Sequence, residues 1–337
     1  MKVREALLNG PLGFGTAPLG NMFRNIPEEE AAETAAAAWD AGTRLFDTAP
    51  FYGAGLAEIR LGKELVKHPR DEYVLSTKVG RIILDEILDG PQEFGEKGTL
   101  FQYGRKNRVV HDYTADGAKR SIEDSLKRMG LDRIDFVWIH DIAADFHGDA
   151  WIDMFETAHK GAMPALDALR DQGVIKGWGI GVNRVEAVEL LLGLSDVRPD
   201  GTLLAGRYSL LDHELALQRL MPMAQEKGVD LVIGGPYSSG ILAGGQTFEY
   251  ADASPEIIAK VDKIKNLAAR YDVPIKAAAL QFVLAHPATA AVIPGASRPD
   301  RIKGDHEALA APIPDDFWRE LRAEKLVSAA APLPIDR

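Results

Sequence analysis

The feature that most constrains the fold is a regular alternation of short apolar runs and longer amphipathic segments along the 337 residues. The runs are rich in Val, Ile and Leu and short enough to be strands, whereas the segments between them have helical spacing. Strands that alternate with helices are parallel and joined by right-handed crossovers. Eight such units favour a closed (β/α)8 TIM barrel, with an open doubly wound sheet as the alternative. The predicted strands are residues 12–16, 43–47, 73–78, 134–139, 175–182, 202–205, 229–233 and 290–293.

The segments between the predicted strands begin and end with residues that are typical of helix ends. Residues 27–41 are rich in Ala and Glu, begin at Pro27 and are followed by Gly42. Residues 118–129 repeat apolar side chains at helical spacing and end at Gly130. The remaining predicted helices, including extra ones near the C-terminus, are residues 55–66, 162–171, 185–192, 215–227, 256–270, 275–285 and 315–324.

The two ends of the chain lie outside this alternation. Residues 2–20 are expected to form a short N-terminal hairpin that leads into the first strand. Residues 326–337 contain Pro332 and Pro334 and are expected to fray. Since no change of composition marks a linker, we expect a single domain over residues 1–337.

The composition of the chain disfavours several classes of partner and excludes chemistry that needs cysteine. Lys and Arg total 39 against 50 Asp and Glu, a net charge of −11, and no basic block is present, which disfavours nucleic acid and anionic membranes. The absence of cysteine excludes disulfides and thiol chemistry. No apolar run approaches the about 20 residues that span a bilayer, and residues 1–11 lack a signal-peptide core. We expect a cytoplasmic protein with a small-molecule substrate, and its oligomeric state stays open.

Titratable side chains stand where neighbouring predicted strands end. Asp47 ends one strand, with Tyr52 in the following loop, Lys78 ends the next and His140 ends the fourth. The C-terminal ends of barrel strands form one face, which carries active sites. A lysine in that position is unfavourable unless paired, and Asp47 is the expected partner. Each of these residues taken alone could have a purely structural role: Lys78 in an ion pair, His140 as a core histidine and Tyr52 as a packed ring. Four titratable residues at the same end of the barrel favour a catalytic site.

Two long connections leave the same face of the predicted barrel. Residues 80–113 follow the third strand and residues 238–253 follow the seventh, and both contain several glycines. Connections of this length are uncommon unless they are functional. We expect both to cover the substrate.

Four motifs resemble the aldo-keto reductase superfamily: residues 47–53 (DTAPFYG), 76–78 (STK), 139–141 (IHD) and 293–296 (IPGA). The resemblance extends in order along essentially the whole chain. Further stretches are similar to the bacterial branch that contains D-threo-aldose (L-fucose- and galactose-type) 1-dehydrogenases and pyridoxal 4-dehydrogenases. These stretches are residues 112–117, 120–126, 130–135 and 205–212.

The resemblance implies a catalytic tetrad of Asp47, Tyr52, Lys78 and His140. Tyr52 would be the base in alcohol oxidation and the acid in carbonyl reduction. Lys78, held by Asp47, would lower its pKa from about 10, and His140 would orient the substrate oxygen. The implied activity is NAD(P)-dependent oxidation of the C1 hydroxyl of an aldose to a lactone. A pyridoxal 4-dehydrogenase or a general aldehyde and ketone reductase is the alternative.

The resemblance also implies a nicotinamide coenzyme at the barrel mouth, with Tyr237 stacked on its ring. Many NADPH-dependent relatives have Lys and Asn where this chain has Gly295 and Asp305, and both changes disfavour a 2′-phosphate. We therefore expect NAD, while Arg298 and Arg301 leave NADP possible. The implied coenzyme residues are Thr16, Asp47, Asn183, Tyr237, Ser238, Gly240, Leu242, Gly295, Ala296, Ser297, Arg298, Arg301 and Asp305.

The residues that bind the substrate are inferred from the chemistry of the two candidate substrates. An aromatic platform would suit pyridoxal, and several hydrogen-bonding groups would suit a sugar. The candidates that serve one or both are Phe51, Tyr103, Trp138 and Asp141.

Two other classes of function remain. A metal-assisted hydrolase could use Asp47, His140 and Asp141, but no close pair of histidines ends a strand and Lys78 would repel a cation, so no metal is expected. A non-catalytic subunit that holds coenzyme, as in some channel-associated relatives of the family, is opposed by the complete tetrad.

Overall fold

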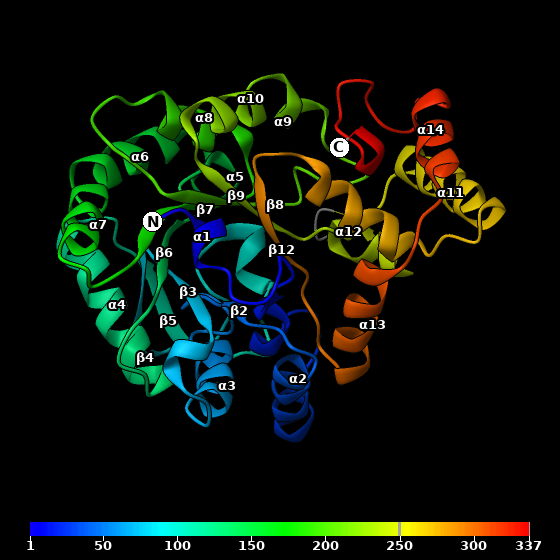
Figure 1. Ribbon diagram of the computed structural model, residues 1–337. Helices are drawn as coiled ribbons and strands as arrows, with labels where there is room; N and C mark the ends of the chain where they lie inside the picture. Colours follow the sequence, from blue (N-terminus) through cyan, green and yellow to red (C-terminus); the bar gives the residue numbers. More distant parts are fainter. Residues whose placement is uncertain (249–250, 337) are drawn as a thin grey trace.

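The computed structural model describes residues 1–248 and 251–336, and its centre is a sheet of eight parallel strands (Figure 1). The first and last strands meet, because Leu12 and Gly15 form parallel bridges with Val292 and Gly295. The predicted (β/α)8 barrel is therefore confirmed, with every strand close to its expected place. In spatial order the strands are β1 (Phe14–Gly15), β2 (Leu45–Asp47), β3 (Val74–Val79), β6 (Phe136–His140), β7 (Gly177–Val182), β8 (Gly201–Ala205), β9 (Asp230–Gly234) and β12 (Thr289–Ile293).

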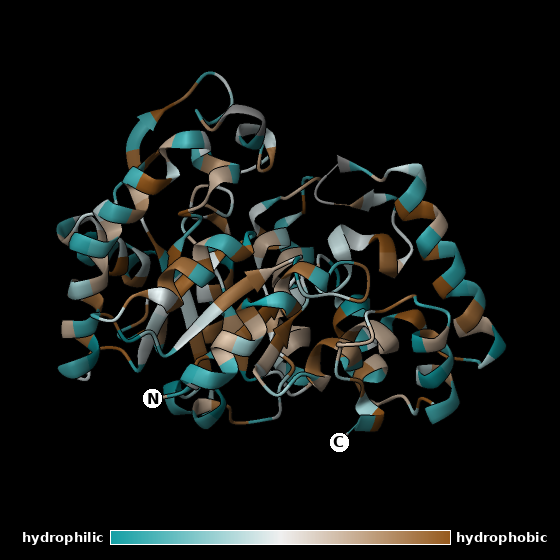
Figure 2. Ribbon diagram, turned by 90° about the horizontal axis from the view of Figure 1, so that it is seen from above, coloured by the Kyte–Doolittle hydropathy of each residue, from teal (hydrophilic) through white to brown (hydrophobic). Residues whose placement is uncertain are grey.

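Helices surround the strands, and Figure 2 shows largely apolar strands in the middle with polar residues on the helices around them. The helices of this outer layer are α2 (Glu28–Asp40), α3 (Leu56–Leu65), α4 (Ala115–Met129), α6 (Trp151–Lys160), α7 (Ala162–Asp171), α8 (Val185–Gly193), α9 (Glu214–Gln218), α10 (Leu220–Lys227), α11 (Pro255–Arg270), α12 (Ile275–Ala285), α13 (Pro299–Ala310) and α14 (Asp315–Ala323). The sequence did not indicate α6 and α13. The helix expected over residues 215–227 is interrupted at Arg219, whose φ of −140° is not helical.

Helix α4 illustrates how local sequence sets these boundaries. The Thr114 hydroxyl accepts a hydrogen bond from the Gly117 N–H and caps the first turn. Ile122 and Met129 pack inward, and Gly130 ends the helix at a φ of 69°.

The N-terminus forms a short helix, α1 (Val3–Ala6), so the expected N-terminal hairpin is wrong. Glu5 accepts a hydrogen bond from the Lys2 N–H at 3.1 Å, which favours a helical turn. Val3 and Ala6 then cover the N-terminal end of the barrel core. A hairpin occurs instead inside residues 80–113, where β4 (Arg81–Ile87) pairs antiparallel with β5 (Asn107–His111).

The C-terminal segment is packed, which corrects the expectation that residues 326–337 fray. Leu326, Val327, Ala331 and Leu333 are buried in the main core. The Ser328 N–H donates to His213 Nε2 at 3.0 Å. Pro332 therefore lies between two buried apolar side chains, Ala331 and Leu333, while position 337 lies outside the described residues.

No helix in the described ranges combines the length and the apolar character that crossing a membrane requires.

Candidate active site

A buried ion pair joins the C-terminal ends of two neighbouring strands. Asp47 on β2 is paired in register with Ser76 on β3, so Lys78, two residues further along β3, faces the same way. Lys78 Nζ lies 2.6 Å from Asp47 Oδ2 and donates to the Thr48 carbonyl at 2.8 Å, and Ser76 Oγ donates to Asp47 Oδ1 at 2.7 Å. The side chains of Lys78 and Asp47 are only 1% and 3% exposed. The pairing predicted for these two residues is confirmed.

Tyr52 lies above this pair in a tight turn. Gly53, Ala54 and Gly55 all have positive φ angles, of 66°, 51° and 86°. The turn packs backbone to backbone against Gly20, where an added Cβ would lie 2.5 Å from the carbonyl carbon of Tyr52. This packing holds Lys78 Nζ 4.8 Å from the centre of the Tyr52 ring.

The pKa of the Tyr52 phenol is raised well above its usual value, mainly by burial and then by the charges of Asp47 and Asp141. This corrects the expectation that Lys78 lowers the pKa of Tyr52. The positive charge of Lys78 is compensated by Asp47 at 2.6 Å, and it does not offset the desolvation of the phenolate. Tyr52 is therefore a neutral phenol near pH 7.

His140 ends β6 and is buried beside two charged residues. Arg81 Nη1 lies 2.9 Å from His140 Nδ1 and donates to Asp141 Oδ2 at 2.7 Å. Burial, and then the charges of Arg81 and Lys78, holds the pKa of His140 well below its usual value. Burial raises the pKa of Asp141 to about 6. The sequence did not identify Arg81, because it lies in a stretch predicted to be a loop, and its only signal was a cation three residues after Lys78.

A small pocket of about 70 Å³ opens beside Tyr52 and His140. Three phenylalanine rings form part of its wall, and the Phe51 ring centre lies 5.2 Å from that of Phe101 and 5.9 Å from that of Phe146. The other side chains that line it are Ala17, Met22, Lys78, Lys97, Leu100, Asp141, Val182, Asn183, Leu203 and Ala205. Residues from the 80–113 connection thus line the pocket, together with the predicted Phe51 and Asp141.

The two other substrate candidates lie elsewhere. Trp138 is 1% exposed and stacks on Phe136 inside the barrel, because its position on β6 points into the barrel core. Tyr103 is 48% exposed and is not among the residues that line the pocket. The structure therefore does not bring Trp138 or Tyr103 to this pocket.

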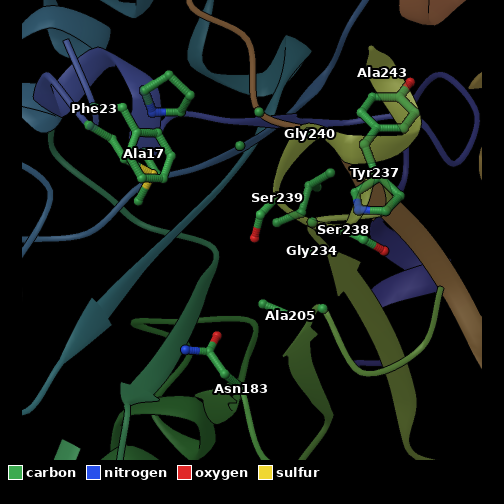
Figure 3. A pocket seen from close by; sticks show the side chains of 18 of the residues that line it. Ala17, Phe23, Asn183, Ala205, Gly234, Tyr237, Ser238, Ser239, Gly240 and Ala243 are labelled. Carbon is green, nitrogen blue, oxygen red and sulfur yellow. The ribbon is translucent and has the colours of Figure 1, made fainter. Parts of the chain in front are cut away.

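A larger cavity of about 490 Å³ continues from this pocket and shares Tyr52 and Asn183 with it. Figure 3 shows Tyr237 and Ala243 across it from Ala17 and Phe23. Nine of the predicted coenzyme residues line it: Asp47, Asn183, Tyr237, Ser238, Gly240, Gly295, Ser297, Arg301 and Asp305.

The other four predicted coenzyme residues do not line the cavity. Thr16, Leu242 and Ala296 are fully buried in the surrounding core. Arg298 is exposed on the surface, with its Nε 3.8 Å from Asp300 Oδ1.

The cavity wall fits a dinucleotide. Four of its residues have positive φ angles: Gly235 (58°), Ser238 (49°), Ser239 (59°) and Gly240 (101°). The Ser238 and Gly240 N–H groups donate to the Gly235 and Tyr237 carbonyls at 3.0 Å, so these turns fold the segment tightly and leave a concave backbone surface. A Cβ at Gly240 would meet no atom within 4 Å, so the backbone there is open to a ligand. The 238–253 connection therefore contributes to the cavity, with residues 249 and 250 outside the described part.

Asp305 is neutralised by a residue that the sequence did not indicate. Lys276 Nζ, from α12, lies 2.6 Å from Asp305 Oδ1, and the Tyr237 hydroxyl donates to the same oxygen at 2.7 Å. All three residues line the large cavity. The carboxylate therefore opposes a 2′-phosphate less strongly than its sequence position suggested. No local motif pointed to Lys276, since it reaches the cavity only through the packing of α12 against α13.

Within residues 1–248 and 251–336, no group of three or more His, Asp or Glu side chains is arranged to hold a metal ion.

Comparison with known proteins agrees with this geometry. The model of the Aldo/keto reductase family matches residues 11–325. The chain is 39% identical to a pyridoxal 4-dehydrogenase of Microbacterium luteolum, with 96% of each chain covered. It is 36% identical to a D-threo-aldose 1-dehydrogenase of a Pseudomonas species, with 94% of each covered. A solved aldo-keto reductase of Bacillus halodurans superposes with a TM-score of 0.72 at 27% identity, covering 98% of this chain and 96% of that one. The chain belongs to the aldo-keto reductase family and is an NAD(P)-dependent oxidoreductase.

Proposed function

We propose that this protein oxidises the hydroxyl of a cyclic hemiacetal to a lactone, and that its substrate is of the pyridoxal type. The observation that carries this proposal is the pocket beside Tyr52 and His140, whose walls include Phe51, Phe101 and Phe146. Pyridoxal closes on itself to a hemiacetal, just as an aldose does, so the reaction is the same for both candidates.

The aromatic walls favour pyridoxal over the aldose. Flat rings suit a pyridine ring, which can stack or meet them edge to face. A sugar needs hydrogen-bonding partners for several hydroxyls, and a site that lacks them binds it poorly. The polar side chains that line this pocket in addition to Tyr52 and His140 are Lys78, Lys97, Asp141 and Asn183, and Lys78 is already paired with Asp47. The aldose remains the second candidate, supported by Lys97, Asp141 and Asn183 and by the 36% identical relative.

In this proposal, each of the four tetrad residues has its own role in the reaction. A bound nicotinamide would supply the hydride acceptor, and the substrate hydroxyl would lose its proton to the Tyr52 oxygen. Asp47 holds Lys78 with its Nζ 4.8 Å from the centre of the Tyr52 ring. Because Asp47 compensates the charge of Lys78, the proton acceptor would be the small phenolate fraction that grows as pH rises. His140 would hold the substrate oxygen by a hydrogen bond. The raised pKa of Tyr52 makes its base form scarce at neutral pH, so oxidation should accelerate as pH rises.

The same residues would also catalyse the reverse reaction, the reduction of a carbonyl group. A neutral Tyr52 carries the proton that reduction requires, so reduction of an aldehyde or ketone should proceed best at neutral or acidic pH. General carbonyl reduction is therefore an expected reverse activity.

We propose NAD as the coenzyme. Asp305 lies in the cavity and can bind ribose hydroxyls, which NAD has and a 2′-phosphate replaces. Lys276 and Arg301 line the same region, so some use of NADP is expected as well.

The decisive assay follows reduced nicotinamide with NAD or NADP and a panel of pyridoxal, L-fucose, D-arabinose and D-galactose. We expect the highest kcat/KM with pyridoxal and NAD. Faster turnover of an aldose would transfer the proposal to the sugar, and failure with every donor in both directions would contradict it. A preference for NADP would refute the coenzyme assignment alone.

A further inference from the structure

A buried guanidinium lies directly behind His140. The Arg81 side chain is 1% exposed, and its Nη1 contacts both His140 Nδ1 and Asp141 Oδ2, at 2.9 and 2.7 Å. The guanidinium carbon also lies 4.1 Å from the centre of the Phe51 ring and 4.5 Å from that of Phe146. Two rings and one carboxylate therefore hold this group in one orientation.

The contact with Arg81 decides which nitrogen of His140 carries a proton. An arginine nitrogen can only donate and stays protonated in proteins. His140 Nδ1 must therefore accept, which leaves the single N–H of a neutral imidazole on Nε2. A proton on Nδ1 would place two N–H groups against each other at 2.9 Å. Only Nε2 is then available to a ligand in the pocket that His140 lines.

We propose that Arg81 is a positioning residue that fixes His140 as the neutral Nε2–H tautomer, so that this ring donates a hydrogen bond to the substrate. The group that binds at His140 must then be an acceptor, such as a hydroxyl, carbonyl or ether oxygen. The use of this donor in turnover depends on the proposed function, whereas the tautomer itself does not.

The surroundings of His140 show what the loss of Arg81 would change. Asp141 Oδ2 lies 3.3 Å from His140 Nε2 and is otherwise paired with Arg81. Without the guanidinium, Asp141 Oδ2 would lie 3.3 Å from a neutral His140 ring with no cation between them, and its charge would favour the imidazolium. The other groups that face or contact His140 are Lys78 on β3, His111 on β5, the Tyr52 ring at 5.9 Å and Tyr113, whose hydroxyl donates to the His140 carbonyl at 2.8 Å. Of these, only Lys78 is a cation, and it is paired with Asp47.

The first test uses the unmodified protein. After labelling of its histidines with ¹⁵N, the His140 signals are assigned by their loss in a His140→Gln variant. We expect a protonated Nε2 and an unprotonated Nδ1 from pH 8 down to pH 5. A protonated Nδ1 anywhere in that range would overturn the proposal, whether or not any substrate is known.

The second test removes the guanidinium by Arg81→Met and restores a cationic donor by Arg81→Lys. In Arg81→Met we expect kcat to fall about 10- to 100-fold, with the coenzyme KM nearly unchanged and an additional loss of activity below about pH 7. Arg81→Lys should recover part of kcat and the original pH profile. Arg128→Met is the matched control, because Arg128 pairs with buried Glu58 and does not line the pocket. The same pH profile and histidine spectrum in Arg81→Met as in the unmodified protein would contradict the proposal, and if that variant does not fold, the first test decides.

Discussion

The two ends of the barrel both carry ion pairs, but they bury them differently. At the N-terminal end, Arg4 pairs with Asp230, and the arginine is 46% exposed while the aspartate is 2% exposed. At the C-terminal end, Lys78 and Asp47 are 1% and 3% exposed. The first arrangement keeps its cation in water, whereas the second removes both charges from it.

The difference in burial indicates that the two ion pairs have different roles. A pair with one exposed member is worth little, since water solvates the cation in either state. A fully buried pair gains little net stability over apolar side chains, because desolvation offsets the attraction. The buried pairs at the C-terminal end are therefore explained by what they position, while the N-terminal pair only fastens α1 to the barrel. Substitutions at the two ends should have different signatures.

The largest effect is expected at Tyr52. Tyr52→Phe keeps the ring and its packing but removes the proton acceptor, so turnover should fall about 100- to 10,000-fold. Coenzyme affinity, measured by fluorescence titration, and the thermal unfolding midpoint should stay nearly unchanged. A variant with near-normal kcat would show that another group transfers the proton.

Lys78→Met should affect both activity and stability. It leaves the Asp47 carboxylate buried without its cation, which destabilises by about 3–5 kcal/mol. Urea unfolding measures this loss, and the steady-state assay should detect little turnover. The double variant Asp47→Asn with Lys78→Met removes both charges and should regain most of the stability but none of the activity. If the double variant is as unstable as the single one, the charge of Asp47 is not the cause.

The features that could be predicted from the sequence are those set by local signals, and the features that were missed depend on the packed fold. Strand positions were predictable because apolar runs and turn residues are local signals, and the pairing of Lys78 with Asp47 followed from strand ends sharing one face. The short helix α1 was missed because four residues carry no periodicity, and its burial depends on the barrel that it covers.

Arg81 and Lys276 were missed for a related reason. Each is an isolated cation whose partners, Asp141 and Asp305, lie 60 and 29 positions away. No spacing rule links such residues, so only the packed structure brings them together. The direction of the pKa shift of Tyr52 was wrong because the sequence shows a nearby cation but not the burial that outweighs it.

His111, on the hairpin at the C-terminal end, offers a pH test of this burial. Burial, followed by the charges of Arg81 and His147, lowers the pKa of His111 to about 3, whereas an unfolded chain titrates near 6.5. The unfolded state therefore binds the extra proton first, and stability is lost as pH falls from about 6.5 towards 3. His111→Gln should reduce the slope of stability against pH between 6 and 4 by about 1 kcal/mol per unit. Urea unfolding at several pH values measures this slope, and an unchanged slope would mean that His111 titrates normally.

The smallest effect is expected at the N-terminal end. Arg4→Ala removes the guanidinium from Asp230, but the Arg4 backbone N–H still donates to Asp230 Oδ2 at 2.8 Å. The carboxylate therefore keeps one partner and can be reached by water once the half-exposed guanidinium is gone, so stability should fall by less than in Lys78→Met, by about 1–2 kcal/mol. The values of kcat and KM should not change, because the substitution lies at the end of the barrel opposite the pocket. A several-fold drop in kcat with normal folding would show that α1 influences the catalytic face, and the division between the two ends would then fail.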